Sequence, residues 1–162
     1  MSYDLRYTQE GDGAYLKDWL NDPEIINWFP MELGIELDDS VKHWISYYRF
    51  NCSLTALIRD KPCGLCTLNL LPYRKIAHQC LISIIVDKNE RGKGVGSLLL
   101  NNIIDIAKEQ FKMTHLYLEV YIGNPAIHLY ERFGFKQVGC QDYYVRNVDG
   151  SYLGKIIMER PL

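Results

Sequence analysis

The sequence predicts an α/β protein built on one mixed sheet, and three stretches carry this prediction. Residues 81 to 86, Leu-Ile-Ser-Ile-Ile-Val, form a short apolar run rich in β-branched side chains, which is typical of a strand buried on both faces. Residues 95 to 108 repeat apolar side chains at helical spacing. Residues 115 to 121 alternate apolar and polar side chains as a further strand. A glycine-rich stretch joins the first two, so the chain there runs strand, turn, helix.

The N-terminal part predicts one strand and two helices. Residues 4 to 8 alternate as a half-exposed strand. Asp12 is the expected cap of a helix that runs to Asn21, and Asp22-Pro23 closes it. The apolar segment 25 to 33 is interpreted as a loop or broken helix. Asp38-Asp39-Ser40 is expected to cap a second helix that reaches about Phe50.

The remaining elements complete the sheet. We expect a hairpin of strands 53–59 and 63–71, a central strand 79–87, a short helix from Pro125 to Arg132 that Gly134 stops, and two final strands, 135–145 and 152–159, joined by Asp149-Gly150. The sum is about seven strands with about four helices, in the order β-α-α-β-β-β-α-β-α-β-β. At 162 residues the whole chain, 1–162, is expected to form a single domain.

Composition limits the partners and the setting. A net charge of −2 gives no general attraction to nucleic acid or to an anionic membrane. The first residues lack the apolar region of a secretory signal, and no run approaches the roughly 18 apolar residues of a membrane span. Five cysteines are an odd number and predict free thiols. We therefore expect a cytoplasmic protein, either a monomer or a homodimer.

Cys63 and Cys66 have the spacing of a metal or redox pair. No second pair accompanies them to complete a tetrahedral site, and residues three apart in a strand point to opposite faces. We therefore predict no metal site.

The glycine-rich stretch 91 to 96, Arg-Gly-Lys-Gly-Val-Gly, has the composition of an anion-binding turn. It lies at the N-terminus of a predicted helix, where unpaired backbone N–H groups and the positive end of the helix dipole meet. Its glycines allow close backbone approach, and Arg91 and Lys93 add positive charge. The alternative is a turn whose glycines only satisfy backbone geometry. Two other phosphate-binding patterns, G-x-G-x-x-G and G-x-x-x-x-G-K-S/T, are absent.

Two motifs in this order resemble the GNAT superfamily of acetyl-CoA-dependent N-acetyltransferases. The first is Arg-x-x-Gly-x-Gly at 91 to 96, which resembles that family's pyrophosphate-binding motif. The second, at 124 to 135, reads Asn-Pro-Ala-Ile-His-Leu-Tyr-Glu-Arg-Phe-Gly-Phe and resembles the family's N-x-A-x-x-L-Y-E-x-x-G-F segment. The resemblance covers roughly residues 3 to 160 and is strongest from 80 to 140, and it implies a GNAT-like fold.

The resemblance also implies where acetyl-CoA would bind. In the family, the central strand and the next parallel strand splay apart and expose backbone groups to the cofactor arm, including an N–H that polarises the thioester. The implied cofactor-binding residues are Ile84, Ile85, Val86, Arg91, Gly92, Lys93, Gly94, Val95, Gly96 and Asn124. Asn124 could equally serve only as a helix cap, since five residues separate it from Tyr130 where many relatives have six.

Tyr130 and Glu119 are the implied catalytic residues. Tyr130 stands where the family's general acid lies, and a phenol with a pKa of about 10 can protonate a leaving thiolate; the alternative is a core tyrosine. Many relatives place a glutamate base early in the central strand, where this chain has Cys80, and a buried cysteine is more often inert. Glu119 resembles the base of ribosomal-protein N-terminal acetyltransferases; the alternative is a surface carboxylate.

The sequence thus predicts an enzyme that moves an acetyl group from acetyl-CoA directly to a primary amine. The acceptor is a protein or peptide N-terminus or a small-molecule amine; the lack of a firm base favours an amine of low pKa. The resemblance implies that Trp28, Phe29 and Met31 wall the acceptor site; alternatively they only pack on the core. The rival function is a non-catalytic acyl-CoA-binding or regulatory module.

Overall fold

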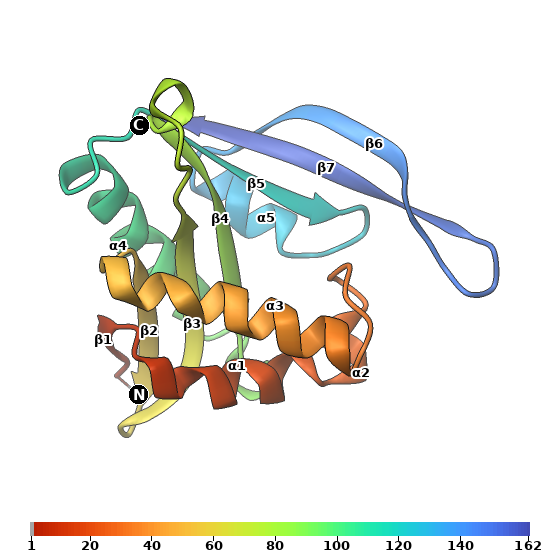
Figure 1. Cartoon of the computed structure of the whole chain (residues 1–162), viewed down its shortest axis with the longest axis horizontal. Coiled ribbons are helices and arrows are strands. Elements are labelled where there is room, and N and C mark those ends of the chain that lie inside the picture. The colour runs from red at the N-terminus through yellow and green to blue at the C-terminus, as the bar shows by residue number, and fades with distance from the viewer. Residues whose placement is uncertain (1) are drawn as a thin grey trace.

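A computed structural model describes residues 2–162. Its centre is a seven-stranded mixed sheet in the order β1-β2-β3-β4-β5-β7-β6 (Figure 1). The strands are β1 (Asp4–Tyr7), β2 (Ser53–Ile58), β3 (Lys61–Asn69), β4 (Gln79–Val86), β5 (His115–Tyr121), β6 (Lys136–Arg146) and β7 (Tyr152–Pro161). β4 and β5 pair in parallel, and every other neighbouring pair is antiparallel. The predicted mixed sheet is therefore confirmed.

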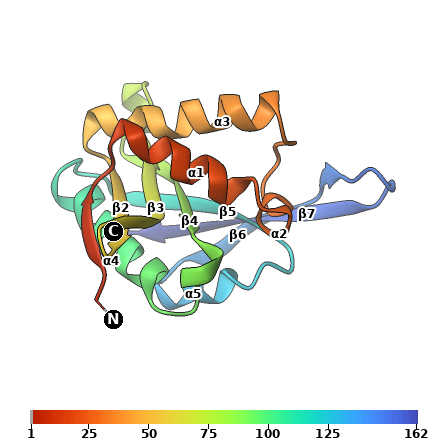
Figure 2. The same ribbon diagram turned by 90° about the horizontal axis from the view of Figure 1, so that it is seen from below.

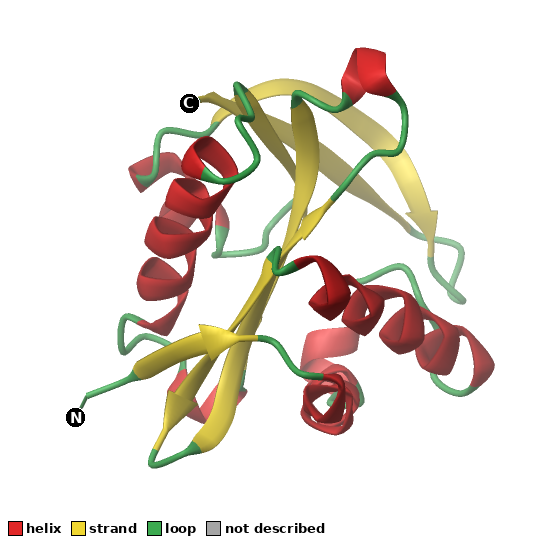
Figure 3. Ribbon diagram, turned by 60° about the vertical axis from the view of Figure 1, so that its left-hand side comes forward, coloured by secondary structure: helices red, strands yellow, loops and turns green. Residues whose placement is uncertain are grey.

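Helices cover both faces of the sheet, as the turned views show (Figures 2 and 3). The five α-helices are α1 (Gly13–Leu20), α2 (Pro23–Ile26), α3 (Ile35–Ile45), α4 (Val95–Glu109) and α5 (Ile127–Arg132). α4 and α5 pack with the larger apolar core on one face. α1, α2 and α3 pack with a second core on the other face, which Leu65 and Ile85 of the sheet complete. Both faces of β3 and β4 are thus buried, as the continuous apolar run of residues 81 to 86 predicts.

The central helix α4 lies close to the sheet because β3 carries a glycine beneath it. A Cβ atom on Gly64 would lie 3.1 Å from side-chain carbons of Val95 and of Leu99. The first turn of α4 is therefore held against β3. This contact fixes the N-terminus of α4 relative to the end of β4.

Several helix and strand ends differ from those predicted. α3 begins at Ile35, after Gly34 at φ +93°, so Asp38 and its neighbours lie inside the helix, where an acidic first turn complements the dipole. The short α2 is additional: Asp22 accepts a hydrogen bond from the Glu24 N–H, and Pro23 occupies its first turn. The turn between β2 and β3 falls at Arg59 and Asp60, both at positive φ, one to two residues earlier than expected.

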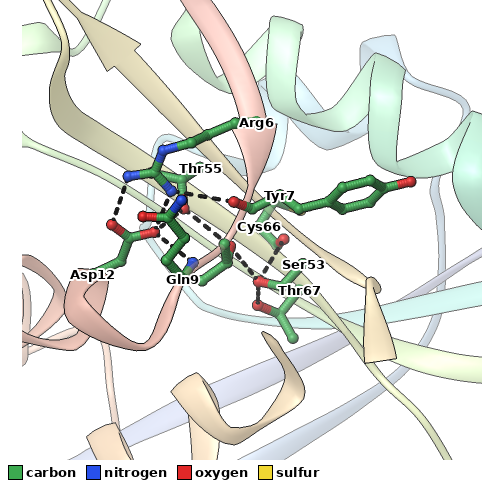
Figure 4. A network of polar contacts seen from close by, with 9 residues as sticks. Arg6, Tyr7, Gln9, Asp12, Ser53, Thr55, Cys66 and Thr67 are labelled. Carbon is green, nitrogen blue, oxygen red and sulfur yellow. Dashed lines mark hydrogen bonds and ion pairs between the residues drawn. The ribbon is translucent and has the colours of Figure 1, made fainter. Parts of the chain in front are cut away.

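Asp12 occupies the N-cap position of α1, but its side chain does not cap the helix. No side-chain hydrogen bond caps that helix, and the Asp12 carboxylate instead forms two hydrogen bonds with Arg6, of 2.7 and 2.8 Å. It also accepts from the Gln9 N–H at 2.9 Å and from the Thr55 hydroxyl at 2.8 Å (Figure 4). The carboxylate does not cap α1 because it is held by Arg6 of β1 and Thr55 of β2, which the local sequence does not reveal.

These contacts belong to a larger network that we call the N-terminal polar cluster. Its hydrogen bonds run in sequence through β1, β2 and β3 to α3. The members are Arg6, Thr8, Asp12, Trp44, Ser53, Thr55 and Thr67. The cluster attaches the layer of α1 and α3 to the sheet.

The last hairpin extends away from the body of the molecule (Figure 1). β6 is an edge strand with most of its residues exposed, and at its far end Tyr143 packs edge to face on Tyr152, with ring centroids 5.1 Å apart. Among residues 2–162, no helix is both long enough and apolar enough to span a membrane.

Candidate active site

The parallel strands β4 and β5 pair only at their N-terminal ends. Gln79, Cys80 and Leu81 face His115, Leu116 and Tyr117. Beyond these three pairs the strands part, with β4 remaining on β3 and β5 remaining on β7. Figure 1 shows the two strands diverging toward their carboxyl ends. We call this parting the splay, made of residues 82–86 of β4 and 118–121 of β5.

The splay leaves backbone groups of β4 without a strand partner. The Asp87 N–H donates to the Cys63 carbonyl at 2.8 Å, so odd-numbered residues of β4 direct their N–H and C=O groups toward β3. Ile84 and Val86 therefore direct their N–H and C=O groups toward β5, which does not pair with β4 beyond Leu81. The Val86 carbonyl accepts a hydrogen bond of 3.2 Å from Arg91 Nε. Ile85 instead presents its backbone to β3 and its side chain to the core below α1 and α3.

The glycine-rich turn follows immediately and opens α4. Gly92 and Gly94 have φ of +72° and +93°, and a Cβ on either would meet open space. Gly94 is the N-cap, and no side chain caps the helix; its first turn contains no acidic residue. The first amides of a 15-residue helix are therefore available to an anion.

Gly96 has a different reason to be glycine. It lies inside α4, and a Cβ there would come within 2.9 Å of a methyl carbon of Leu129 in α5. The missing side chain lets the N-terminus of α4 approach α5. The third glycine of the motif thus brings the second motif next to the first.

The two cations of the turn are engaged differently. Arg91 bonds the Val86 carbonyl, while Lys93 Nζ lies 3.0 Å from the Asn89 carbonyl and 3.3 Å from Glu90 Oε2. Glu90 also accepts from the Tyr3 hydroxyl at 2.7 Å. The charge of Lys93 is therefore partly compensated within the turn.

Tyr130 of α5 is buried in the larger core, with its ring 6.4 Å from that of Phe135. Burial raises its pKa well above the ordinary value, the Cys66 thiol adds to this effect, and the nearby charge of Arg91 opposes it. No hydrogen bond contributes to that shift. Tyr130 thus stays protonated at neutral pH and lies near the glycine turn.

The cysteines are free thiols, and four of them are buried. Cys80 is fully buried, its Sγ lies 3.5 Å from the sulfur of Met113, and burial raises its pKa to about 12. This environment disfavours the thiolate that a base or nucleophile requires. Cys63 and Cys66 belong to the same core rather than to opposite faces, because a β-bulge interrupts the β2–β3 register at that point. The described residues contain no group of three or more side chains suited to hold a metal ion.

Asn124 holds the turn that leads into α5. Its side-chain oxygen accepts a hydrogen bond of 3.0 Å from the Ala126 N–H, and its carbonyl accepts from the Ile127 N–H at 3.3 Å. α5 begins at Ile127, two residues later than predicted. Asn124 thus orders the turn before α5, whose N-cap residue is Ala126 without a side-chain cap.

Glu119 lies in the splay on the face of β5 opposite to α4 and α5. Its side chain is 35% exposed, and its Oε2 lies 3.1 Å from Lys155 Nζ of β7. Lys155 is almost fully buried, with Nζ 3.7 Å from the ring centroid of Tyr144. Sequence analysis found Glu119 but not its partner, because a lone lysine in a predicted strand carries no motif.

Tyr121 is two residues beyond Glu119 on the same face of β5 and pairs with Lys155 across the strands. The residue is 6% exposed, and its hydroxyl has no hydrogen-bond partner within residues 2–162. The other such buried group is Nη1 of Arg160. Burial raises the pKa of Tyr121, with smaller contributions from Tyr144 and Glu119. We call Glu119, Tyr121, Tyr144 and Lys155 the β5–β7 polar cluster.

The segment between α1 and α3 packs mainly on the second core. Phe29 and Met31 contact that core, and the Phe29 ring lies 6.1 Å from Trp44. Trp28 is half-buried and belongs to neither core. The packing interpretation thus accounts for Phe29 and Met31.

The arrangement combines an anion-binding helix start, a parting of parallel strands and a buried phenol near both. A model of the acetyltransferase (GNAT) family matches residues 14–135, most of the chain. The chain belongs to the GNAT acetyltransferase family.

The names of curated relatives give different acceptors. An N-alpha-acetyltransferase of Sulfurisphaera tokodaii is 36% identical over 74 residues, which cover 45% of this chain and 44% of that protein. A probable spermine N(1)-acetyltransferase of Bacillus subtilis subsp. natto is 39% identical over 59 residues, 36% of this chain and 39% of that protein. The matched part of the GNAT chain thus spans less than half the length of either relative.

Solved structures share the whole fold. A putative acetyltransferase from Salmonella typhimurium, determined with its cofactor acetyl-CoA, has a TM-score of 0.82 at 17% identity. The comparison covers all of this chain and 95% of that one. The predicted GNAT fold is therefore confirmed.

Proposed function

We propose that this protein is an acetyl-CoA-dependent N-acetyltransferase that moves the acetyl group directly to a primary amine. The observation that carries the proposal is the splay beside the glycine turn, because it leaves β4 backbone groups unpaired next to an uncapped helix N-terminus. Membership of the GNAT family and the acetyl-CoA in the Salmonella relative support the same cosubstrate.

The turn is proposed to bind the pyrophosphate of acetyl-CoA. Backbone N–H groups from Arg91 to Gly96 would donate to the phosphate oxygens, and Arg91 and Lys93 would add charge. The positive φ of Gly92 and Gly94, with open space where a Cβ would stand, supports this role. The backbones of Ile84 and Val86 would line the arm, and the N–H of one of them would polarise the thioester carbonyl, an interaction worth about 3 kcal/mol in a water-poor site. Ile85 does not line the arm, because its backbone pairs with β3 and its side chain lies in the second core. Asn124 would contribute its side-chain amide.

Tyr130 is proposed as the general acid. The acceptor nitrogen bonds to the thioester carbon, the carbon–sulfur bond breaks, and the Tyr130 hydroxyl donates its proton to the departing sulfur. Solvent then returns a proton to the phenolate. A phenol is already neutral at physiological pH at its ordinary pKa of about 10, and burial raises the pKa of Tyr130 further.

Glu119 is proposed to take the proton from the acceptor amine, directly or through a water molecule. Its exposed carboxylate in the splay supports this role, and Lys155 at 3.1 Å orients it. The Cys80 thiol is a poor alternative because burial raises its pKa to about 12.

Cofactor binding is tested with Gly94→Ala. The new Cβ would project into the space proposed for the phosphate, so we expect acetyl-CoA affinity measured by isothermal titration to fall at least tenfold. Gly150→Ala is the matched control, because Gly150 also has positive φ and open space but lies in the β6–β7 turn. Equal acetyl-CoA affinity in the two variants would refute pyrophosphate binding at the glycine turn.

Catalysis is tested with Tyr130→Phe in a thiol-release assay over a panel of amines. The ring and its packing remain, but the proton is lost, so turnover should fall by roughly 10² to 10⁴ with acetyl-CoA affinity little changed. Turnover within threefold of the unsubstituted protein would make Tyr130 structural. Acetyl-CoA binding without turnover on any amine would favour the non-catalytic acyl-CoA-binding module.

We further propose a single domain over residues 1–162, a monomer or homodimer, in the cytoplasm. Five free cysteines, four of them buried, support a reducing compartment. The net charge of −2 supports an amine acceptor other than nucleic acid.

A further inference from the structure

The β5–β7 polar cluster contains a hydroxyl that folding buries without giving it a partner. Tyr121 is 6% exposed and its oxygen is fully shielded, yet no group of residues 2–162 hydrogen-bonds it. Buried polar groups in folded proteins are nearly always paired, so an orphaned one calls for a partner from outside the protein, such as a ligand or an ordered water. It lies at the carboxyl end of β5, in the splay where the acceptor must approach the thioester.

The neighbours of this hydroxyl restrict the group that can bind it. Tyr121 keeps its proton at physiological pH, because burial raises its pKa, and so is available as a donor. Lys155, its cross-strand partner, offers it no acceptor and is itself engaged by Glu119 and the Tyr144 ring. A protonated hydroxyl without an acceptor favours a ligand group that accepts hydrogen bonds, such as a carbonyl or carboxylate oxygen.

Glu119 favours the complementary group. It carries only acceptors when ionised and lies on the same face of β5 as Tyr121. An amine fits beside Glu119, and an oxygen that accepts a hydrogen bond fits beside Tyr121. An α-amino acyl group combines the two with one carbon between them. A polyamine lacks the oxygen that the Tyr121 hydroxyl would bind.

We propose that Tyr121 is a specificity-determining residue that donates a hydrogen bond to the carbonyl or carboxylate oxygen next to the acceptor amine. The acceptor is therefore an α-amino acyl compound, either a free amino acid or a peptide N-terminus. This inference rests on the proposed acetyltransferase function and names its substrate class.

The test measures kcat/KM for three acceptors: glycine, glycinamide and ethylamine. They carry a carboxylate, an amide carbonyl and no oxygen, respectively. Tyr121→Phe removes the hydroxyl and keeps the ring. We expect it to lower the ratio of kcat/KM for the preferred oxygen-bearing acceptor to that for ethylamine by roughly five- to fiftyfold, the loss of one hydrogen bond to a substrate. Comparing each acceptor across variants removes the effect of the amine's own pKa.

The control is Tyr143→Phe, an exposed tyrosine of β6, which should keep the unsubstituted ratio. If Tyr121→Phe lowers the kcat/KM ratio for glycine alone, the acceptor is a free amino acid. If it lowers the ratio for glycinamide, the acceptor is amide-linked, as in a peptide. An unchanged ratio in Tyr121→Phe overturns the proposal, as does unsubstituted protein that acetylates ethylamine and neither glycine compound.

Acetyl-CoA binding without acetylation of any of the three acceptors overturns the substrate class alone. Failure of the unsubstituted protein to bind acetyl-CoA overturns the proposed function itself.

Discussion

The two polar clusters of this protein share chemistry but differ in how completely their groups are paired. Both place a cation, a carboxylate and hydroxyl groups between strands. In the N-terminal polar cluster the Asp12 carboxylate alone accepts four hydrogen bonds, and its side chain is 4% exposed. In the β5–β7 polar cluster Glu119 has one cation at 3.1 Å, and the Tyr121 hydroxyl has no partner.

The difference separates structural from functional use of polar groups. A fully paired buried network holds elements in a fixed arrangement, since the loss of any partner leaves another group unsatisfied. An incompletely paired network has capacity left for a ligand, and the protein loses some stability by keeping it. The position of each cluster agrees with this distinction: the first joins α1 and α3 to the sheet, and the second lies in the splay.

The largest expected contrast comes from removing the cation of each cluster. Arg6→Met leaves the buried Asp12 carboxylate without its charge partner and should lower the free energy of unfolding by about 3 kcal/mol. Lys155→Met leaves Glu119 able to contact water, because its side chain is 35% exposed, and should change stability by less than about 1 kcal/mol. Urea unfolding at pH 7 measures both. Equal losses would mean that the β5–β7 polar cluster is also structural.

The hydroxyl groups give a second, smaller contrast. Thr55→Val removes a hydroxyl that donates to Asp12 and should cost about 2 kcal/mol, because hydrogen bonds to charged groups are the stronger ones. Tyr121→Phe removes a hydroxyl without a partner and should leave stability unchanged or raise it by up to about 1 kcal/mol. Thermal unfolding of both variants checks this. Loss of more than 1 kcal/mol in Tyr121→Phe would reveal a hydrogen bond that the structure lacks.

The smallest effect is a pH dependence specific to the N-terminal polar cluster. Burial alone would raise the pKa of Asp12, but hydrogen bonds from Arg6, the Gln9 N–H and Thr55 outweigh it and hold that pKa below its ordinary value. The ionised carboxylate therefore adds stability above its unfolded pKa of about 3.9, and this contribution is lost as the pH falls through the lower folded pKa.

Asp12→Asn removes this contribution. The difference in free energy of unfolding between the unsubstituted protein and Asp12→Asn should narrow by about 1 kcal/mol as the pH falls from 7 to about 3. Asp38→Asn, in an exposed pair with Lys17 at 2.8 Å, is the control and should stay within about 0.5 kcal/mol throughout. A difference that stays constant with pH would contradict the account of Asp12.

The sequence alone determined the strand–turn–helix at the centre of the molecule and most strand positions. β5 spans residues 115 to 121 as predicted, and Gly94 takes the positive φ expected of a glycine at a helix start. These features follow from apolar periodicity and glycine chemistry, which act over a few residues and are visible in the local sequence. The two motifs added the GNAT family and fold.

Only the tertiary structure decided which side chains meet. The end of pairing after Leu81 and Tyr117, the capture of Asp12 by Arg6 and Thr55, and the placement of Lys155 opposite Tyr121 all depend on the register between strands. Register is set by the packing of the whole sheet, and no local pattern encodes the partner of a single polar residue. The orphaned hydroxyl of Tyr121 is visible for the same reason only after the sheet has formed around it.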